Sequence, residues 1–155
     1  MQNFKNYWVN INFKPGNLKA QEEFIKLDMS HFTRIKTRIV EKKYLKLALT
    51  DLGYGYQEGK VQIRGYGGNR TTVELKITTQ NSGYDIGFQK SGNCYEVVAD
   101  WWGIRDLKQD VFVQTVNQRY AYHVAKSKLE EQGFSLVSEE VEEKERIHLV
   151  LRRVV

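Results

Sequence analysis

Four short segments in the middle of the chain alternate apolar and polar residues, and connections rich in Gly and Asn separate them. The segments are residues 60–66, 71–79, 84–90 and 94–101. Alternation with a period of two is typical of strands that bury one face. Gly and Asn accept the backbone angles of tight hairpins. Strands that follow one another so closely pair with their neighbours, so the pattern predicts an antiparallel meander.

A strand and a helix are predicted ahead of this meander. Residues 31–40 place β-branched residues at odd positions and cations at three even positions, which is again a period of two. Residues 41–52 repeat Leu and Ala at helical spacing, and Gly53 follows them at a position where helices commonly end. The chain is therefore expected to open with a β–α unit.

A long helix and a hairpin are predicted after the meander. Asp106 and Gln109 form a candidate N-cap pair, and Gly133 marks the end of the helix. Apolar residues recur at every fourth position between them: Phe112, Val116, Tyr120 and Val124. Residues 134–138 and 146–154 then alternate as a closing hairpin.

The element order β-α-β-β-β-β-α-β-β predicts the fold class. Runs of strands that do not alternate regularly with helices are typical of α+β proteins. We therefore expect an antiparallel sheet with two helices on one face, arranged as a variant of the ferredoxin-like fold.

The first 28 residues differ in character from the rest. They contain the only proline, Pro15, and a short amphipathic stretch over residues 18–27. An isolated helix of this length is marginal in water, and chain termini are common sites of disorder. We expect residues 1–28 to be a non-native or disordered extension, with translation starting at Met29, and residues 29–155 to form a single α+β domain. A docking helix over residues 18–27 is the alternative.

Composition excludes several classes of protein. No apolar run approaches the roughly 20 residues that span a bilayer, and the first residues lack the apolar core of a signal peptide. Cys94 is the only cysteine, so an intrachain disulfide or a multi-cysteine metal site cannot form. The net charge of +5 permits a polyanionic partner without requiring one. We expect a soluble, cytoplasmic protein without a membrane span.

The sequence contains no catalytic constellation. The three histidines lack the spacing of a metal site: His31, His123 and His148. The glycine-rich residues 65–70 precede a predicted strand, so they indicate a turn and not a phosphate-binding loop. Three aspartates are candidates for an acid–base set but show no catalytic pattern in the sequence: Asp85, Asp100 and Asp106. The sequence predicts no catalytic, cofactor-binding or metal site, and an enzyme is the least supported class.

One predicted strand carries a row of cations that project from the same sheet face. With residues expected on the neighbouring strand and with Trp102, this row forms a candidate binding surface: Arg34, Lys36, Arg38, Arg64, Tyr66 and Trp102. Cations beside an aromatic residue on an open sheet can hold single-stranded RNA, or an acidic protein. The alternative is a solvated face on which Glu74 and Glu96 pair with the cations.

Several separated segments resemble one small protein family. They are residues 29–37, with the sequence MSHFTRIKT, the predicted helix end at 49–53, and residues 98–101 and 118–122. These segments resemble the hypothetical chloroplast reading frame thirty-five family, a domain of unknown function in cyanobacteria and algal plastid genomes. The resemblance extends over residues 29–155 and implies a cyanobacterial cytoplasm or a plastid stroma. It carries no catalytic residues, and the first 28 residues depart from the family pattern.

Two functions from different classes remain open. The first is a non-enzymatic interaction or assembly protein of a photosynthetic cell, which binds another protein through the cation row and the region around Trp102. The second is an RNA-binding module that uses the cations of the same sheet face.

Overall fold

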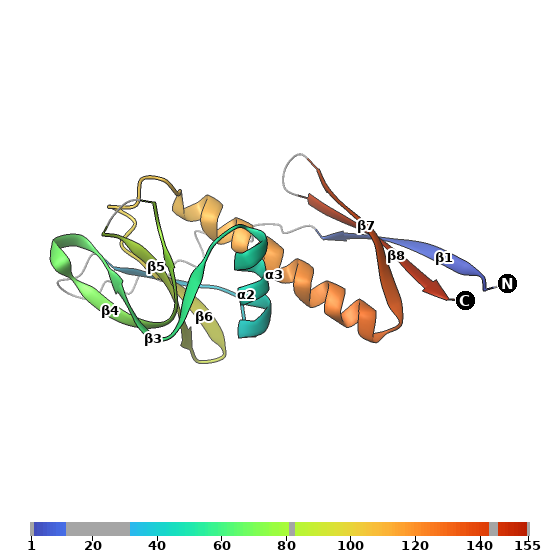
Figure 1. Ribbon diagram of the computed structural model, residues 1–155, viewed down its shortest axis with the longest axis horizontal. Coiled ribbons are helices and arrows are strands. Elements are labelled where there is room, and N and C mark those ends of the chain that lie inside the picture. The colour runs from blue at the N-terminus through green and yellow to red at the C-terminus, as the bar shows by residue number, and fades with distance from the viewer. Residues whose placement is uncertain (1, 12–31, 81–82, 143–145, 155) are drawn as a thin grey trace.

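The computed structural model describes residues 2–11, 32–80, 83–142 and 146–154. Its elements in chain order are β1 (Phe4–Ile11), β2 (Thr33–Lys36), α2 (Lys42–Asp51), β3 (Tyr56–Arg64), the short 3-10 helix η1 (Tyr66–Gly68), β4 (Arg70–Thr78), β5 (Asp85–Ser91), β6 (Cys94–Ala99), α3 (Gln109–Glu131), β7 (Phe134–Glu142) and β8 (Arg146–Val154). The strands form two antiparallel sheets (Figure 1). The predicted α+β class is confirmed.

The larger sheet has the strand order β2-β6-β5-β4-β3. Strands β3 to β6 pair antiparallel with their neighbours in the chain, which confirms the predicted meander. β2 joins the free side of β6, so that Ile35 lies opposite Val97. In a ferredoxin-like sheet the strands of split βαβ units interleave. Here the first strand of the sheet lies at its edge, so the order differs from the expected variant.

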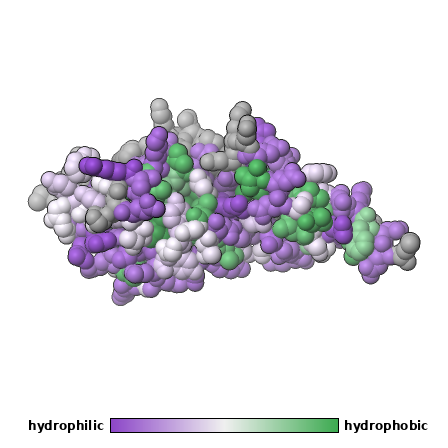
Figure 2. Space-filling model, turned by 45° about the horizontal axis from the view of Figure 1, so that its top comes forward, coloured by the Kyte–Doolittle hydropathy of each residue, from purple (hydrophilic) through white to green (hydrophobic). Residues whose placement is uncertain are grey.

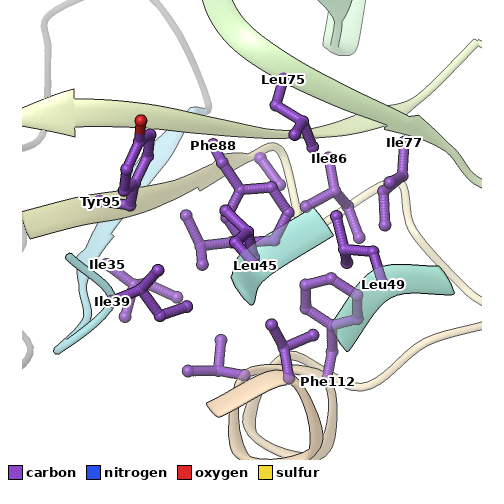
Figure 3. Close-up of a cluster of buried hydrophobic side chains, with 14 of the residues drawn as sticks. Ile35, Ile39, Leu45, Leu49, Leu75, Ile77, Ile86, Phe88, Tyr95 and Phe112 are labelled. Carbon is purple, nitrogen blue, oxygen red and sulfur yellow. The ribbon is translucent and has the colours of Figure 1, made fainter. Parts of the chain in front are cut away.

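Both helices pack on one face of the larger sheet, as predicted. Leu45 and Leu49 of α2 meet Phe112 of α3 and Phe88 of β5 in the main hydrophobic core (Figure 3). Phe88 and Val97 lie opposite each other on adjacent strands and therefore face the same side of the sheet. The alternation that predicted the strands thus also supplies the surface on which the helices rest.

The opposite face of this sheet is covered as well. Val98 follows Val97 in β6, points to the other face, and packs with Phe32, Ile63 and Val73. Phe32 precedes β2 at one edge of the sheet, whereas Ile63 lies in β3 at the other edge. The sheet therefore curls until its two edges approach each other.

The predicted closing hairpin forms, but it belongs to a second sheet with the order β1-β8-β7. The 23 residues of α3 span about 35 Å and carry the chain away from the larger sheet (Figure 1). The hairpin therefore cannot extend the first sheet, and the single sheet expected from the sequence is replaced by two. Three buried residues of β8 pack against α3 around Tyr122: Ile147, Leu149 and Leu151.

The long helix α3 buries different sides along its length. Phe112 and Val116 pack against the larger sheet, as the predicted stripe requires. Farther along, Tyr122 is buried while Tyr120 is only partly buried, because this half of the helix faces the smaller sheet. Because the two halves of α3 face different sheets, a single apolar stripe does not predict which of its side chains are buried along the whole helix.

The predicted N-cap of α3 is wrong. The helix begins at Gln109 and its N-cap is Lys108, whose backbone is still extended and whose side chain makes no capping bond. Asp106 lies two residues too early, and its carboxylate accepts a hydrogen bond from the N–H of Gln80 at 3.0 Å. Within the described part of the chain, no helix is both long enough and apolar enough to cross a membrane.

The strand β1 lies inside the segment expected to be non-native or disordered. It pairs with β8 along its whole length, from Phe4 opposite Val154 to Ile11 opposite Ile147. Val9 and Ile11 pack into the core of the smaller sheet, so the expectation of disorder does not hold for these eight residues. Residues 12–28, with the alternative docking helix, lie outside the described residues. The start at Met29 and the boundary of the domain stay predictions.

Candidate binding surface

Two exposed aromatic residues that follow different strands of the larger sheet lie in contact with each other. Tyr66 lies in η1, just after β3, and Trp102 follows β6. Their rings stand edge to face at 88° with centroids 5.3 Å apart. Trp102 is 73% exposed and Tyr66 48% exposed. Because the sheet curls until the end of β3 approaches the end of β6, residues 36 positions apart form one surface, which we call the aromatic pair.

Two buried carboxylates hold the backbone on which Tyr66 stands. Asp85, at the start of β5, accepts the N–H of Arg64 at 2.9 Å, and Asp100, just after β6, accepts the N–H of Tyr66 at 2.8 Å. Both carboxylates are almost completely buried. Asp85 also pairs with the Arg64 guanidinium through contacts of 3.0 and 3.2 Å. Hydrogen bonds to buried charged groups are among the stronger ones in proteins, so this turn is firmly placed.

Gly65, between these two anchored residues, has no room for a side chain. A Cβ atom there would lie 2.8 Å from the Phe32 ring and 3.2 Å from Cβ of Asp100. The glycine therefore lets the end of β3 approach the end of β6. The glycine-rich stretch continues through Gly67, which has a positive φ of 65°, directly into β4. As predicted from the sequence, it is a turn between strands.

The two adjacent tryptophans after β6 have different environments. Trp101 turns toward the main core, where its ring lies 5.8 Å from that of Phe112. Trp102 points outward beside Tyr66. Gly103 follows them, and a Cβ atom at that position would overlap the Tyr84 ring. Close packing of this turn thus fixes which tryptophan is inside and which is outside.

The predicted row of cations is divided by the fold. β2 and β3 were expected to be neighbours, but they lie at opposite edges of the larger sheet. Arg64 is therefore near the aromatic pair, whereas the cations of β2 run along a different strand. Thr33 pairs with Ala99 and Lys36 with Glu96, so the β2 strand leads away from Trp102, and Arg38 lies beyond its end.

Carboxylates neutralise two of the predicted cations. Arg34 lies 3.4 Å from Glu96, whose side chain is 6% exposed, and Arg64 is paired with Asp85. The sequence-based alternative, in which Glu96 pairs with the cation row, agrees with this contact. Glu74 instead pairs with Lys42 of α2 at 3.5 Å. The surface is consequently less cationic than the sequence suggests.

A second polar network joins the two halves of the molecule and was not anticipated from the sequence. Glu139 of β7 accepts hydrogen bonds from Arg119 at 2.8 Å and from Tyr122 at 2.7 Å, both on α3. Burial of Glu139 opposes ionisation, but these two bonds outweigh it and lower the pKa of the carboxyl group. His123 of α3 lies 2.7 Å from Asp51 at the end of α2. The sequence places Glu139 in a predicted hairpin, and no pattern in the sequence indicates that it pairs with the long helix.

Other candidate groups are scattered. His148 lies 3.0 Å from Glu142, and His31 is outside the described residues. Cys94 is half-buried. Within the described ranges, no group of three or more His, Cys, Asp or Glu side chains is arranged to hold a metal ion.

A pocket of about 230 Å³ lies at the start of α3, where Tyr54, Asp106 and Phe112 are among its lining residues. Burial, and secondarily the Asp106 carboxylate, raises the pKa of Tyr54. Apolar side chains line most of the pocket, and Asp106 itself is tied to Gln80. The pocket therefore offers a small apolar recess and no pair of catalytic groups.

Comparison with known proteins identifies the family. Residues 48–150 match a family described as a protein of unknown function, DUF1257. The chain is 34% identical over 127 residues to the uncharacterized protein ycf35 of Cyanophora paradoxa, and the match covers 81% of this chain and 98% of that protein. The chain belongs to this ycf35 family.

Other ycf35 proteins are equally similar to the chain. The uncharacterized ycf35 protein of Guillardia theta is 35% identical over 127 residues, and that of Pyropia yezoensis is 34% identical over 131 residues. Each match covers 81% of this chain and 98% of the relative. No solved structure matches the chain. The resemblance inferred from the sequence is confirmed, and the descriptions of these ycf35 proteins assign no activity.

Proposed function

We propose that this protein is a non-enzymatic interaction or assembly protein that docks another protein on the aromatic pair. The observation that carries the proposal is the exposure of Trp102, 73%, on a turn whose neighbours are anchored by buried carboxylates. Burying an exposed aromatic ring is favourable, and tryptophan and tyrosine are enriched among the residues that dominate protein interfaces. An anchored ring also loses little conformational freedom on binding.

The two aspartates beneath the aromatic pair support a structural role. Both Asp85 oxygens accept hydrogen bonds from Arg64, and Asp100 accepts the N–H of Tyr66. A general acid or base needs access to a substrate proton, whereas these carboxylates are buried beneath the turn. Their geometry favours positioning of the surface over chemistry at it.

The pairing of the cations favours a protein partner over RNA. Binding of single strands combines aromatic rings with a groove of cations that follows the backbone. Arg34 and Arg64 are paired with Glu96 and Asp85, and the β2 cations lead away from the aromatic pair. RNA would have to displace these carboxylates. The family resemblance further suggests that the partner is in a cyanobacterial cytoplasm or a plastid stroma.

A capture experiment with a matched pair of variants tests the proposal. Tagged wild-type protein, Trp102→Ala and the control Val111→Ala are incubated with cyanobacterial lysate, with and without nuclease. Val111 is also an exposed apolar residue but lies on α3. We expect a protein that survives nuclease and is captured by wild type and Val111→Ala, with at least a tenfold loss for Trp102→Ala. Equal capture by all three variants would contradict the proposal.

Nucleic acid is the other outcome that this experiment detects. RNA that copurifies and disappears on digestion would replace the protein-docking proposal with the RNA-binding one. In that case affinity falls steeply with salt, and Arg38→Ala makes the salt dependence shallower by about one unit.

A further inference from the structure

The described part of the chain has four sheet edges, and three of them carry features that prevent pairing with another chain. β2 is only four residues long and carries Arg34 and Lys36. β3 is interrupted by a bulge between Glu58 and Val61. β7 has a bulge after Leu136 and carries three glutamates. Short length, charge and bulges are the usual means by which proteins protect strand edges.

The fourth edge, β1, has none of these features. Its eight residues keep an uninterrupted register with β8, and Lys5 is its only charged residue. Phe4 is 52% exposed and Trp8 70% exposed. Figure 2 shows an apolar patch with hydrophilic surroundings over the half of the molecule that carries this sheet. A long, apolar and unprotected edge is a template for another strand.

We propose that β1 pairs antiparallel with β1 of a second copy, so that two three-stranded sheets become one six-stranded sheet across a two-fold axis. We favour a second copy of the chain as the partner of this edge. Among the four edges described, β1 is the one that has no bulge, no row of like charges and no short span, so the β1 strand of a second copy is the best match for it. Pairing between β1 and the partner's β7 would meet the bulge in that strand. Pairing of β1 with β1 uses the same surface on both copies, so the assembly is complete with two chains.

The alternation of β1 restricts the register of this pairing. Val9 and Ile11 face the core, so Trp8 and Asn10 face the opposite side. Directly opposed residues in an antiparallel pair lie on the same face, which leaves only registers centred on a residue. A pair centred on Trp8 places Trp8 opposite its own copy and Asn6 opposite Asn10. Lys5 then faces Ile11 of the partner, so like charges do not meet.

The register centred on Trp8 is favoured over the one centred on Tyr7. Tyr7 already packs edge to face on Phe134 at 5.2 Å, whereas the Trp8 ring is mostly exposed. Pairing two Trp8 rings across the axis buries more new apolar surface, and aromatic pairs directly opposite on adjacent strands stabilise sheets.

Sedimentation equilibrium of the full chain tests the proposal. We expect wild-type protein to have twice the 18.2 kDa mass of the chain at tens of micromolar, and Trp8→Lys to be monomeric at the same concentration. Trp102→Lys is the matched control, because Trp102 is similarly exposed but lies at the other sheet, and it stays dimeric. Thermal melting of Trp8→Lys verifies folding. A wild-type monomer up to several hundred micromolar, or a dimeric Trp8→Lys, overturns the proposal.

Crosslinking tests the register. In a Cys94→Ser background, which removes the natural thiol, Trp8→Cys is oxidised and compared with Val141→Cys on the β7 edge. Opposed cysteines on paired strands lie close to the Cβ separation that a disulfide needs. We expect a covalent dimer for Trp8→Cys and a monomer for Val141→Cys, and the reverse result would overturn the assignment of the edge. Failure here leaves the capture experiment with Trp102→Ala unaffected, so the two proposals are separable.

Discussion

The two sheets of this molecule are covered to different extents. The five-stranded sheet packs against two helices on one face, and on the other face its own residues Ile63, Val73 and Val98 pack together with Phe32. Among the residues that the structure describes, the three-stranded sheet packs against α3 on one face, and large side chains of its other face, such as Trp8, are exposed. The last five residues of β6, 95–99, are therefore all buried, whereas burial alternates along the first six residues of β8. In the part of the chain that the structure describes, the larger sheet is therefore buried on both faces, whereas the smaller one leaves one face and the outer edge of β1 exposed.

The difference in coverage between the two sheets indicates which exposed side chains are candidates for binding a partner. Most apolar side chains of the larger sheet stabilise the fold. Large aromatic rings remain exposed at two places, which are the aromatic pair beside the larger sheet and Trp8 on the smaller sheet. Exposed apolar surface of this kind is typical of interaction sites.

The largest predicted effect compares buried leucines at the centres of the two sheets. Leu75→Ala in β4 is expected to lower the free energy of unfolding by about 4 kcal/mol, and Leu149→Ala in β8 by about 3 kcal/mol. Both side chains are fully buried, but the smaller sheet is packed from one side and relaxes more easily around a cavity. Urea denaturation measures both values. A larger loss for Leu149→Ala would reverse the ranking of the two sheets.

The next effect concerns the anchor beneath the aromatic pair. Asp85→Asn removes the charge that accepts hydrogen bonds from Arg64 and is expected to cost about 2–3 kcal/mol, because Asp85 is fully buried. Glu131→Gln, at an exposed position near the end of α3, is the control and is expected to change stability by less than about 0.5 kcal/mol. Denaturation of both variants checks this, and equal stabilities would mean that Asp85 does not anchor the turn.

A smaller effect depends on pH and reports on the junction between the sheets. Tyr122→Phe removes a hydrogen bond to Glu139 and is expected to cost about 1 kcal/mol at pH 7. Folding lowers the pKa of Glu139 below its ordinary value of 4.5. The stabilisation is therefore complete above that value and is lost as pH falls through the lower, folded pKa.

Urea denaturation of wild type and Tyr122→Phe at a series of pH values from 7 to 3 measures this dependence. The difference between the two proteins is expected to shrink as Glu139 becomes protonated. A difference that is constant over this range would show that the hydrogen bond does not depend on the charge of Glu139.

Much of the fold could be predicted from local patterns. Period-two alternation located the strands of the meander, and leucine spacing located α2, because both signals depend only on nearby residues. The second sheet could not be predicted in this way, since it depends on the length and direction of α3. β1 carries the same signal, with Val9 and Ile11 alternating with polar Asn10, but it lies in a segment that departs from the family pattern.

The candidate surface was predicted in part. Tyr66 and Trp102 were both named from the sequence, and they are adjacent because the curl of the sheet brings the end of β3 to the end of β6. The cations were grouped with them because β2 and β3 were expected to be neighbours. Strand order is a property of the whole fold, so the sequence suggested Glu96 as a partner of the cation row but did not indicate that Asp85 pairs with Arg64.

The smallest predicted effect tests the central claim, that Trp102 is exposed for a partner and not for the stability of the chain. The measurement is the free energy of unfolding of Trp102→Ala beside that of Trp101→Ala, its inward-facing neighbour. We expect Trp101→Ala to lose about 3 kcal/mol or more, and Trp102→Ala to stay within about 0.5 kcal/mol of wild type. A loss of similar size in both variants would place Trp102 in the core and contradict the account.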